Sequence, residues 1–321
     1  MASPVYTLTE ATANPPQNST ILITGAASGI GLATALYLHK PQYKNNIIAL
    51  DKSSTPPPIE ELITSSRFLY LPCDILDWPS QRSAFAAGAA KFSGIDHVFI
   101  NAGISEIGEQ IWTDVYDADG QLQEPNRATI DVDIRAVGDT LKLAMHHLRR
   151  RRKDRSSSST AETRDRSQGS NSIVMTASLA GYLASAGAPL YSAAKHGVVG
   201  YMRALKPDCA QAGISISVIA PGITLTPIIL GRKEGQSIEN WGEEMASKGV
   251  PINSAETVAL AVANLMGMKG LQGNGRGVVI QANRMQEVEE GIAKARGMWM
   301  GKEMLELFRG GRNAPLFPNK L

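Results

Sequence analysis

From Ile21 onward, short runs of β-branched residues alternate with longer stretches of helical periodicity, and this alternation restricts the possible fold more than any other feature of the chain. Such runs are typical of parallel strands buried on both faces, and the stretches between them can form the crossover helices that parallel strands need. Strands are predicted at 21–24, 46–51, 67–71, 97–100, 172–177, 215–219 and 277–281. The pattern therefore predicts an α/β protein with a seven-stranded parallel sheet between two layers of helices.

The division of the chain follows from this pattern and from its interruptions. Residues 20–285 are predicted to form a single domain, because neither a repeat nor a boundary divides them. Residues 1–19 are predicted to be a flexible N-terminal segment, and residues 286–321 a C-terminal extension with an amphipathic stretch. Residues 150–171 are basic, rich in serine and nearly free of apolar side chains, so we expect a disordered surface insertion there. A nuclear signal or phosphate-binding patch in the arginine run is the alternative.

Composition gives little reason to expect a charged partner. The 321 residues include 32 Lys plus Arg against 30 Asp plus Glu, a formal net charge of +2, so neither a nucleic acid nor another acidic partner is expected. No basic segment followed by an apolar core opens the chain, and no apolar run reaches about 18 residues. We expect a cytoplasmic protein without a membrane span. The two cysteines and five histidines lack the spacing of a disulfide scaffold or a metal site, so no metal is predicted.

A glycine-rich turn follows the first predicted strand and opens the first predicted helix. Backbone amides and the helix dipole at such a junction can face a pyrophosphate. Gly25 would permit the tight turn, Gly29 the close approach of a phosphate, and Gly31 the packing of helix against strand, with Ser28 and Ile30 between them. Asp51 ends the second strand, where its carboxylate can accept both ribose hydroxyls of an adenosine and would repel a 2′-phosphate. NAD(H) is therefore predicted over NADP(H), although the neighbouring Lys52 leaves NADP(H) open.

These residues resemble the nucleotide-binding turn of the short-chain dehydrogenase/reductase family, and the resemblance runs from about residue 21 to residue 281. It implies a Rossmann-like, doubly wound domain with strand order 3-2-1-4-5-6-7, and a homodimer or homotetramer. The C-terminal stretch resembles fungal members described loosely as hydroxyprostaglandin-dehydrogenase-like. The resemblance also implies further cofactor contacts, from Asp74, Asn101, Ala102, Gly103, Pro221, Gly222, Ile223 and Thr226.

Two side chains with a chemical role are expected on one helix. Tyr191 and Lys195 are four residues apart, so both face the same side of the predicted helix. A phenol has a pKa of about 10 in water, and a nearby ammonium together with a cationic nicotinamide would make it usable as an acid or base at neutral pH. Both residues are also predicted to contact the cofactor.

The family resemblance adds a serine and exposes one departure. It implies that Ser178 hydrogen-bonds the substrate oxygen while Tyr191 transfers its proton. The family's fourth catalytic position is an asparagine, but this chain has Asp133 there. An ionised Asp cannot donate a hydrogen bond, which puts the helix distortion and the proton relay of the family in question. A buried Asp133 would either stay protonated or pair with Lys195.

Apolar residues in two loops predict a hydrophobic substrate. Tyr182, Leu183, Ile228 and Trp241 are assigned to the pocket, although the same residues could serve only in packing. Ser105 and Glu106 are expected to add a polar contact. The prediction is an oxidoreductase that moves a hydride between NAD(H) and a secondary alcohol or ketone, with a role in secondary metabolism. The alternative is a dinucleotide-binding protein with a non-redox role, either an isomerase, dehydratase or cyclase or a regulatory sensor.

Overall fold

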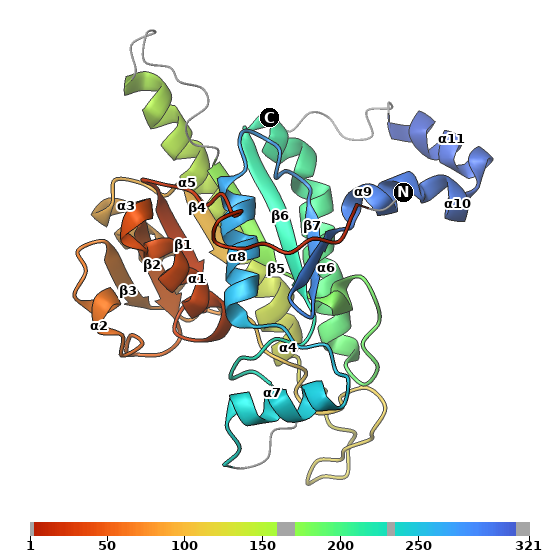
Figure 1. Cartoon of the computed structure of the whole chain (residues 1–321). Coiled ribbons are helices and arrows are strands. Elements are labelled where there is room, and N and C mark those ends of the chain that lie inside the picture. The colour runs from red at the N-terminus through yellow and green to blue at the C-terminus, as the bar shows by residue number, and fades with distance from the viewer. Residues whose placement is uncertain (1–2, 159–170, 230–234, 313–321) are drawn as a thin grey trace.

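The structure is a computed structural model that describes residues 3–158, 171–229 and 235–312. Its centre is one sheet with the strand order β3-β2-β1-β4-β5-β6-β7-β8 (Figure 1). The strands are β1 (Thr20–Thr24), β2 (Asn46–Asp51), β3 (Phe68–Pro72), β4 (His97–Ile100), β5 (Asn171–Thr176), β6 (Ile214–Pro221), β7 (Gly277–Gln281) and β8 (Arg284–Glu287). The first seven are parallel and have the predicted order.

The predicted count of seven strands was wrong by one. β8 turns back after β7 and pairs with it in antiparallel fashion, with Ile280 opposite Met285. Ala282 and Asn283 form the two-residue turn and both have positive φ, as the tightest hairpin turns require. β8 also crosses the predicted boundary between the domain and the C-terminal extension, because Met285 and Glu287 are both buried at the edge of the sheet.

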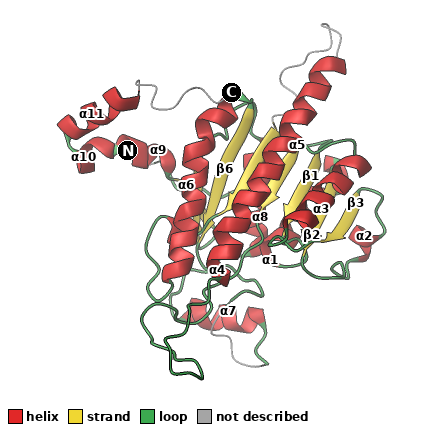
Figure 2. Ribbon diagram, turned by 180° about the vertical axis from the view of Figure 1, so that it is seen from behind, coloured by secondary structure: helices red, strands yellow, loops and turns green. Residues whose placement is uncertain are grey.

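Two layers of helices cover the sheet. The helices are α1 (Gly29–His39), α2 (Glu60–Ile63), α3 (Trp78–Lys91), α4 (Ala128–Ile130), α5 (Ala136–Ser158), α6 (Pro189–Gln211), α7 (Ile238–Ser247), α8 (Ala255–Gly267), α9 (Glu289–Lys294), α10 (Arg296–Met300) and α11 (Lys302–Arg312). One buried cluster joins the sheet to α3, α5 and α6, and a second joins its other face to α1 and α8 (Figures 1 and 2). The fold is therefore the doubly wound α/β domain that the sequence predicts.

The predicted insertion at 150–171 is not irregular throughout. The backbone of α5 stays helical to Ser158, and β5 already begins at Asn171. Arg151 anchors the helix, because its guanidinium forms a 2.9 Å ion pair with the buried carboxylate of Asp96. Arginine is also a good helix former, so the basic run extends the helix by several turns. Residues 159–170 lie outside the described part of the chain.

The N-terminal segment makes specific contacts with the domain, contrary to the expectation of a flexible segment. Tyr6 forms a β-bridge with Met285 on β8, and the Gln286 side chain donates to the Ser3 carbonyl at 3.0 Å. Further along, the Asn14 side chain donates to the Gly267 carbonyl at 2.9 Å. The segment thus lies along the α8 side of the sheet and covers the outer edge of β8 (Figure 1).

The last described helices extend away from the sheet (Figure 1). α9 is tied to the domain by Glu289, which pairs with Arg203 of α6 at 2.9 Å. Met298 and Trp299 of α10 are 89% and 69% exposed. Within residues 3–158, 171–229 and 235–312, no helix combines the length and apolar character needed to cross a bilayer.

Candidate active site

The glycine turn lies where β1 ends and α1 begins, and its shape depends on the missing side chains. Gly25 and Gly29 have φ of +67° and +53°, which L side chains rarely adopt. A Cβ on Gly31 would lie 2.0 Å from the Gly25 carbonyl oxygen, and one on Gly29 would lie 3.0 Å from the Thr226 side chain. Ser28 precedes the helix in extended conformation, and its side chain does not cap the helix. The turn therefore leaves backbone amides open to a ligand.

Asp51 is held at the end of β2 by backbone amides. Its carboxylate accepts hydrogen bonds from Ala27 of the glycine turn at 2.9 Å and from Ser53 at 3.1 Å. The neighbouring Lys52 points to the carboxylate of Asp74, with 3.5 Å between the charged atoms. Asp51 and Asp74 thus lie at the carboxyl ends of the neighbouring strands β2 and β3, and Lys52 pairs with Asp74.

Asn101 joins three strands at the carboxyl edge of the sheet. Its side-chain nitrogen lies 3.2 Å from the Thr24 carbonyl, and its side-chain oxygen accepts from the Thr176 hydroxyl at 3.0 Å. The Asn101 and Ala102 amides both donate to the Thr24 hydroxyl. Asn101 and Ala102 therefore support the glycine turn. This structural role comes in addition to the predicted cofactor contact.

The segment after β6 passes over the glycine turn. Pro221 ends the strand, and Thr224 forms a β-bridge with Asn253, a residue that the sequence analysis did not single out. The Asn253 amide donates to the Ile223 carbonyl at 2.8 Å, and its side chain donates to the Ile280 carbonyl at 3.0 Å. Asn253 is fully buried and fixes the backbone between Gly222 and Thr226. In the sequence, the only indication of this role of Asn253 is its polar side chain between two apolar segments.

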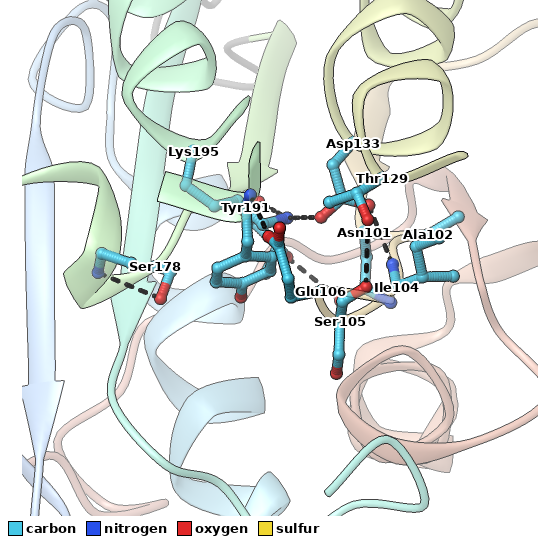
Figure 3. A network of polar contacts seen from close by, with 12 residues as sticks. Asn101, Ala102, Ile104, Ser105, Glu106, Thr129, Asp133, Ser178, Tyr191 and Lys195 are labelled. Atoms are coloured by element: carbon cyan, nitrogen blue, oxygen red, sulfur yellow. Dashed lines mark hydrogen bonds and ion pairs between the residues drawn. The ribbon is translucent and has the colours of Figure 1, made fainter. Parts of the chain in front are cut away.

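Tyr191 and Lys195 lie on one face of α6, as predicted (Figure 3). Lys195 is buried, and its ammonium lies 5.3 Å from the centre of the Tyr191 ring. It also donates to the Thr176 carbonyl at 3.3 Å. The tyrosine is half-buried, so its ring is fixed by packing while part of it stays accessible.

Asp133 pairs with Lys195 through one carboxylate oxygen, at 3.0 Å (Figure 3). Both side chains are buried. This oxygen faces the ammonium without a well-aligned hydrogen bond, whereas the other accepts from the Ile104 amide at 2.8 Å. Gly103 packs over the pair, since a Cβ there would lie 3.2 Å from Asp133 and 3.4 Å from Lys195.

The charge of the lysine depends on this pair. Burial by itself lowers the pKa of Lys195, but the negative charge of Asp133, with a further contribution from Tyr191, outweighs burial and raises the pKa above its ordinary value. The lysine is therefore an ammonium at neutral pH. Of the two predicted outcomes for a buried Asp133, the structure places it in a pair with Lys195.

The helix around Asp133 is distorted although the family's asparagine is missing. Residues Asp131–Arg135 form a π-helical turn, η2, between α4 and α5. Such single turns widen a helix and are frequent at functional sites. An acceptor oxygen at position 133 that bonds the Ile104 amide is compatible with the distortion, so a side-chain donor is not needed for it.

Ser178 follows β5 and lies beside the Tyr191 ring (Figure 3). Its hydroxyl oxygen accepts from the Ala180 amide at 3.2 Å, which caps the short helix η4 (Leu179–Gly181). The hydroxyl also lies 3.4 Å from the Pro221 carbonyl. Ser178 is half-buried, and these contacts hold its hydroxyl at the carboxyl edge of the sheet.

Glu106 lies closer to Tyr191 than the sequence analysis indicated. Its carboxylate accepts hydrogen bonds from the Leu190 amide at 3.3 Å and from the Tyr191 amide at 2.6 Å. Ser105, next to it, donates its hydroxyl to the Ile228 carbonyl at 3.1 Å. Both side chains thus make contacts within the protein, and the polar contact to a substrate stays a prediction.

The four predicted substrate residues differ in their surroundings. The Tyr182 hydroxyl donates to Glu289 of α9 at 2.8 Å, and its ring lies under Arg203, so this side chain anchors the C-terminal helices. Trp241 is buried within α7. Leu183 and Ile228 are 61% and 47% exposed. Leu183 and Ile228 are thus exposed, whereas Tyr182 and Trp241 make contacts within the protein; a substrate contact of the four stays a prediction.

A metal site is not formed by the side chains that the structure describes, since no three His, Cys, Asp or Glu residues among them come close enough to share an ion. The remaining features fit a dinucleotide. A Cβ on Gly29 or Gly31 would crowd neighbouring atoms of the turn. Backbone amides fix the Asp51 carboxylate at the end of β2, and the buried ammonium of Lys195 lies beside the Tyr191 ring. Fold and site together define an oxidoreductase with a dinucleotide-binding domain.

Comparison with known proteins gives the family. Residues 19–237 match the profile described as short chain dehydrogenase, and the chain belongs to this family. It is 30% identical over 298 residues to the short-chain dehydrogenase/reductase prx4 of Penicillium rubens, covering 88% of this chain and 80% of that one. It is 27% identical over 317 residues to the 5'-hydroxyaverantin dehydrogenase of Dothistroma septosporum, covering 93% and 94%.

Solved structures show the same fold. The 3-ketoacyl-(acyl-carrier-protein) reductase of Brucella melitensis, solved with NADH, superposes with a TM-score of 0.63 at 18% identity and covers 83% of this chain and 98% of its own. Levodione reductase superposes with a TM-score of 0.60 at 24% identity, covering 83% and 97%. At these identities the likeness concerns the fold.

Proposed function

We propose that this protein is an NAD(H)-dependent dehydrogenase or reductase that interconverts a secondary alcohol and a ketone on a hydrophobic small molecule. The observation that carries the proposal is the Tyr191–Lys195 pair on α6, with its ammonium buried beside the ring, next to a glycine turn at the end of β1. Relatives named for a hydroxylated substrate and for levodione support an alcohol or ketone as the reacting group.

In this proposal, the residues of the chain divide the work. Gly25, Ser28, Gly29, Ile30 and Gly31 hold the pyrophosphate, and the segment from Pro221 to Thr226 holds the nicotinamide end. When bound, the nicotinamide ring accepts or supplies the hydride. Ser178 donates a hydrogen bond to the substrate oxygen and orients it toward the tyrosine. The Tyr191 hydroxyl gives its proton to that oxygen in reduction and takes it back in oxidation.

Lys195 supports the proton transfer through charge. Its ammonium, close to the Tyr191 ring, stabilises the phenolate that remains after the proton has left. Asp133 holds this ammonium in place, so its role in the mechanism is to position Lys195 rather than to touch the substrate.

The preference for NAD(H) rests on Asp51. Two backbone amides fix its carboxylate, so it cannot move away to admit the phosphate of NADP(H). Lys52, the cation that would favour NADP(H), is oriented toward Asp74. A calorimetric titration with NAD, NADH, NADP and NADPH tests this preference. Asp51→Ser should weaken NADH binding and reduce the discrimination, whereas Lys52→Ala should leave both nearly unchanged; equal binding of NADPH to the unaltered protein would contradict the proposal.

The substrate proposal rests on the exposed apolar side chains near the carboxyl edge of the sheet. Leu183, Ile223 and Ile228 are all more than 40% exposed, and the latter two belong to the segment that passes over the glycine turn. A screen of cyclic and aromatic alcohols and ketones, followed by nicotinamide absorbance at 340 nm, should find turnover. Product formation without an absorbance change would favour the non-redox alternative.

The exposed C-terminal helices support self-association. Met298 and Trp299 form an apolar surface that a monomer in water rarely leaves uncovered. We therefore propose a homodimer or homotetramer. A cytoplasmic location and a role in secondary metabolism, as expected from the sequence, are also part of the proposal. Light scattering on the purified chain measures the oligomeric state, and a monomer at micromolar concentration would contradict this part of the proposal.

A further inference from the structure

The helix that carries Tyr191 begins without a cap of its own. The residue before α6 is Ala188, whose side chain cannot accept a hydrogen bond, and Pro189 at the first position has no N–H. The first amide with a partner inside the helix is that of Ser192, which bonds the Ala188 carbonyl at 2.9 Å. The amides of Leu190 and Tyr191 therefore need acceptors from another part of the chain.

Glu106 supplies both acceptors from the loop after β4. One carboxylate oxygen bonds the Leu190 amide and the other bonds the Tyr191 amide, the latter at 2.6 Å. A carboxylate at the amino end of a helix also interacts favourably with the helix dipole. Figure 3 shows Glu106 reaching the start of the helix from the loop that follows Asn101. A residue 85 positions away thus acts as the missing cap.

The loop that carries Glu106 is itself fixed on its other side. Asp133 accepts from the Ile104 amide at 2.8 Å, and the Thr129 hydroxyl donates to the Ser105 carbonyl at 3.3 Å. The Ser105 hydroxyl reaches Ile228, in the segment that passes over the glycine turn. The loop therefore connects the Lys195–Asp133 pair and the Ile228 segment to the first turn of α6.

We propose that Glu106 is a positioning residue for Tyr191: by bonding the Tyr191 amide it fixes the first turn of α6, and with it the place of the phenol relative to Ser178 and the substrate. This inference rests on the proposed function. It adds a residue that touches neither substrate nor cofactor to the set that determines turnover.

The test compares two caps of the same chemistry. Glu106→Ala removes the acceptor at α6, and Asp77→Ala removes a carboxylate that caps α3 by accepting from the Ser80 amide at 2.9 Å. Each substitution should lower the midpoint of denaturant unfolding by a similar amount, because each removes the acceptor that caps a helix. Only Glu106→Ala should reduce kcat, by about 10- to 100-fold, because a small misplacement of a reacting group has an effect of this size.

A conservative variant and the substrate dependence distinguish positioning from loss of stability. Glu106→Gln keeps one acceptor oxygen, which can bond the Tyr191 amide while the Leu190 amide loses its acceptor, and it should recover part of the lost kcat. In Glu106→Ala the loss should be in kcat, while the affinity for NADH stays close to that of the unaltered protein. Amide hydrogen exchange, read by mass spectrometry on the peptide that spans 189–195, should become faster in Glu106→Ala and remain unchanged in Asp77→Ala.

Two results would overturn the inference. One is unchanged kcat in Glu106→Ala with the same loss of stability as Asp77→Ala, which would make the cap merely structural. The other is unchanged amide exchange at 189–195. If the unaltered protein oxidises and reduces nothing, the proposed function fails, and the exchange experiment still decides by itself whether Glu106 holds the first turn of α6.

Discussion

The two ends of the sheet hold their functional groups by different means. Around β1 to β3, the shape depends on side chains that are absent and on backbone bonds: Gly31 packs on the Gly25 carbonyl, and Asp51 is fixed by amides. Around β4 to β6, charged side chains hold the parts together: Asp133 pairs with Lys195, and the Glu106 carboxylate accepts from backbone amides of α6. A substitution that adds an atom should therefore disrupt the first region, and a substitution that removes a charge should disrupt the second.

The largest effect is expected at the chemical end, from Tyr191→Phe. Loss of the hydroxyl removes the general acid and base, which should reduce kcat by about 100- to 10,000-fold. The affinity for NADH, measured by fluorescence titration, should hardly change because the glycine turn is untouched. Tyr201→Phe on the same helix is the control and should keep its turnover. Substantial activity in Tyr191→Phe would place the proton transfer elsewhere.

Asp133→Asn tests whether charge holds this region together. Removing one partner of a buried ion pair typically costs about 3 to 5 kcal/mol of unfolding free energy. The pKa of Lys195 is raised above its ordinary value of 10.5, so the pair stabilises the fold fully below that pH and progressively less as the pH rises past it. The difference between the two proteins should therefore shrink above pH 10.5.

The control for this variant lies on the same π-helical turn. Asp131 pairs with Arg135 at 3.0 Å on the surface, and Asp131→Asn should change the unfolding free energy by less than about 1 kcal/mol. Denaturant titrations at several pH values measure both variants. A pH-independent difference for Asp133→Asn would contradict an ionic origin.

Gly31→Ala is the matching test of the nucleotide end. The added Cβ would lie 2.0 Å from a backbone oxygen that cannot move aside, so we expect a loss of about 1 to 3 kcal/mol together with weaker NADH binding. Gly200→Ala on α6 adds the same atom where nothing lies within 4 Å, and it should raise stability by up to about 1 kcal/mol. Equal effects of the two substitutions in thermal unfolding would refute the packing argument.

The smallest effect is expected from Tyr182→Phe, outside both regions. Loss of the bond to Glu289 should cost about 1 kcal/mol and leave KM unchanged, because Arg203 still pairs with Glu289. Leu183→Ala should do the reverse, raising KM for an apolar substrate without affecting stability. A raised KM in Tyr182→Phe would return this tyrosine to the substrate site.

Local patterns were sufficient to predict the features that depend on neighbouring residues. The first seven strands and the glycine turn follow from runs of a few residues. The order of the strands follows from the family resemblance. β8 was missed because Arg284–Glu287 contains a single apolar residue, Met285, and is too short to show alternation. α5 was cut short because its arginines were interpreted as a solvated run, whereas Arg151 pairs with Asp96, the residue that precedes β4.

The pairing of Asp133 with Lys195 was one of two outcomes expected from the sequence, but other contacts within the site could not be predicted, because they join residues far apart in the chain. Glu106 and Tyr191 are 85 positions apart, and nothing in the composition of either segment announces the other. Tyr182 was assigned to a pocket by its place after β5, but Glu289 offers it a charged acceptor from 107 positions away. Residue type and spacing indicate which chemistry a side chain can perform. The direction in which the side chain points depends on the residue that it contacts in the folded chain.

The bridge between Tyr6 and Met285 has a consequence for the order in which the molecule assembles. The hydrogen bond of Gln286 to Ser3 spans 283 positions, so the residues around Ser3 cannot reach their place until β8 has been synthesised. Closure of so long a loop is slow, and contacts of high sequence separation form late in folding. During synthesis, the β8 edge of the sheet is therefore the last part of the domain to be covered.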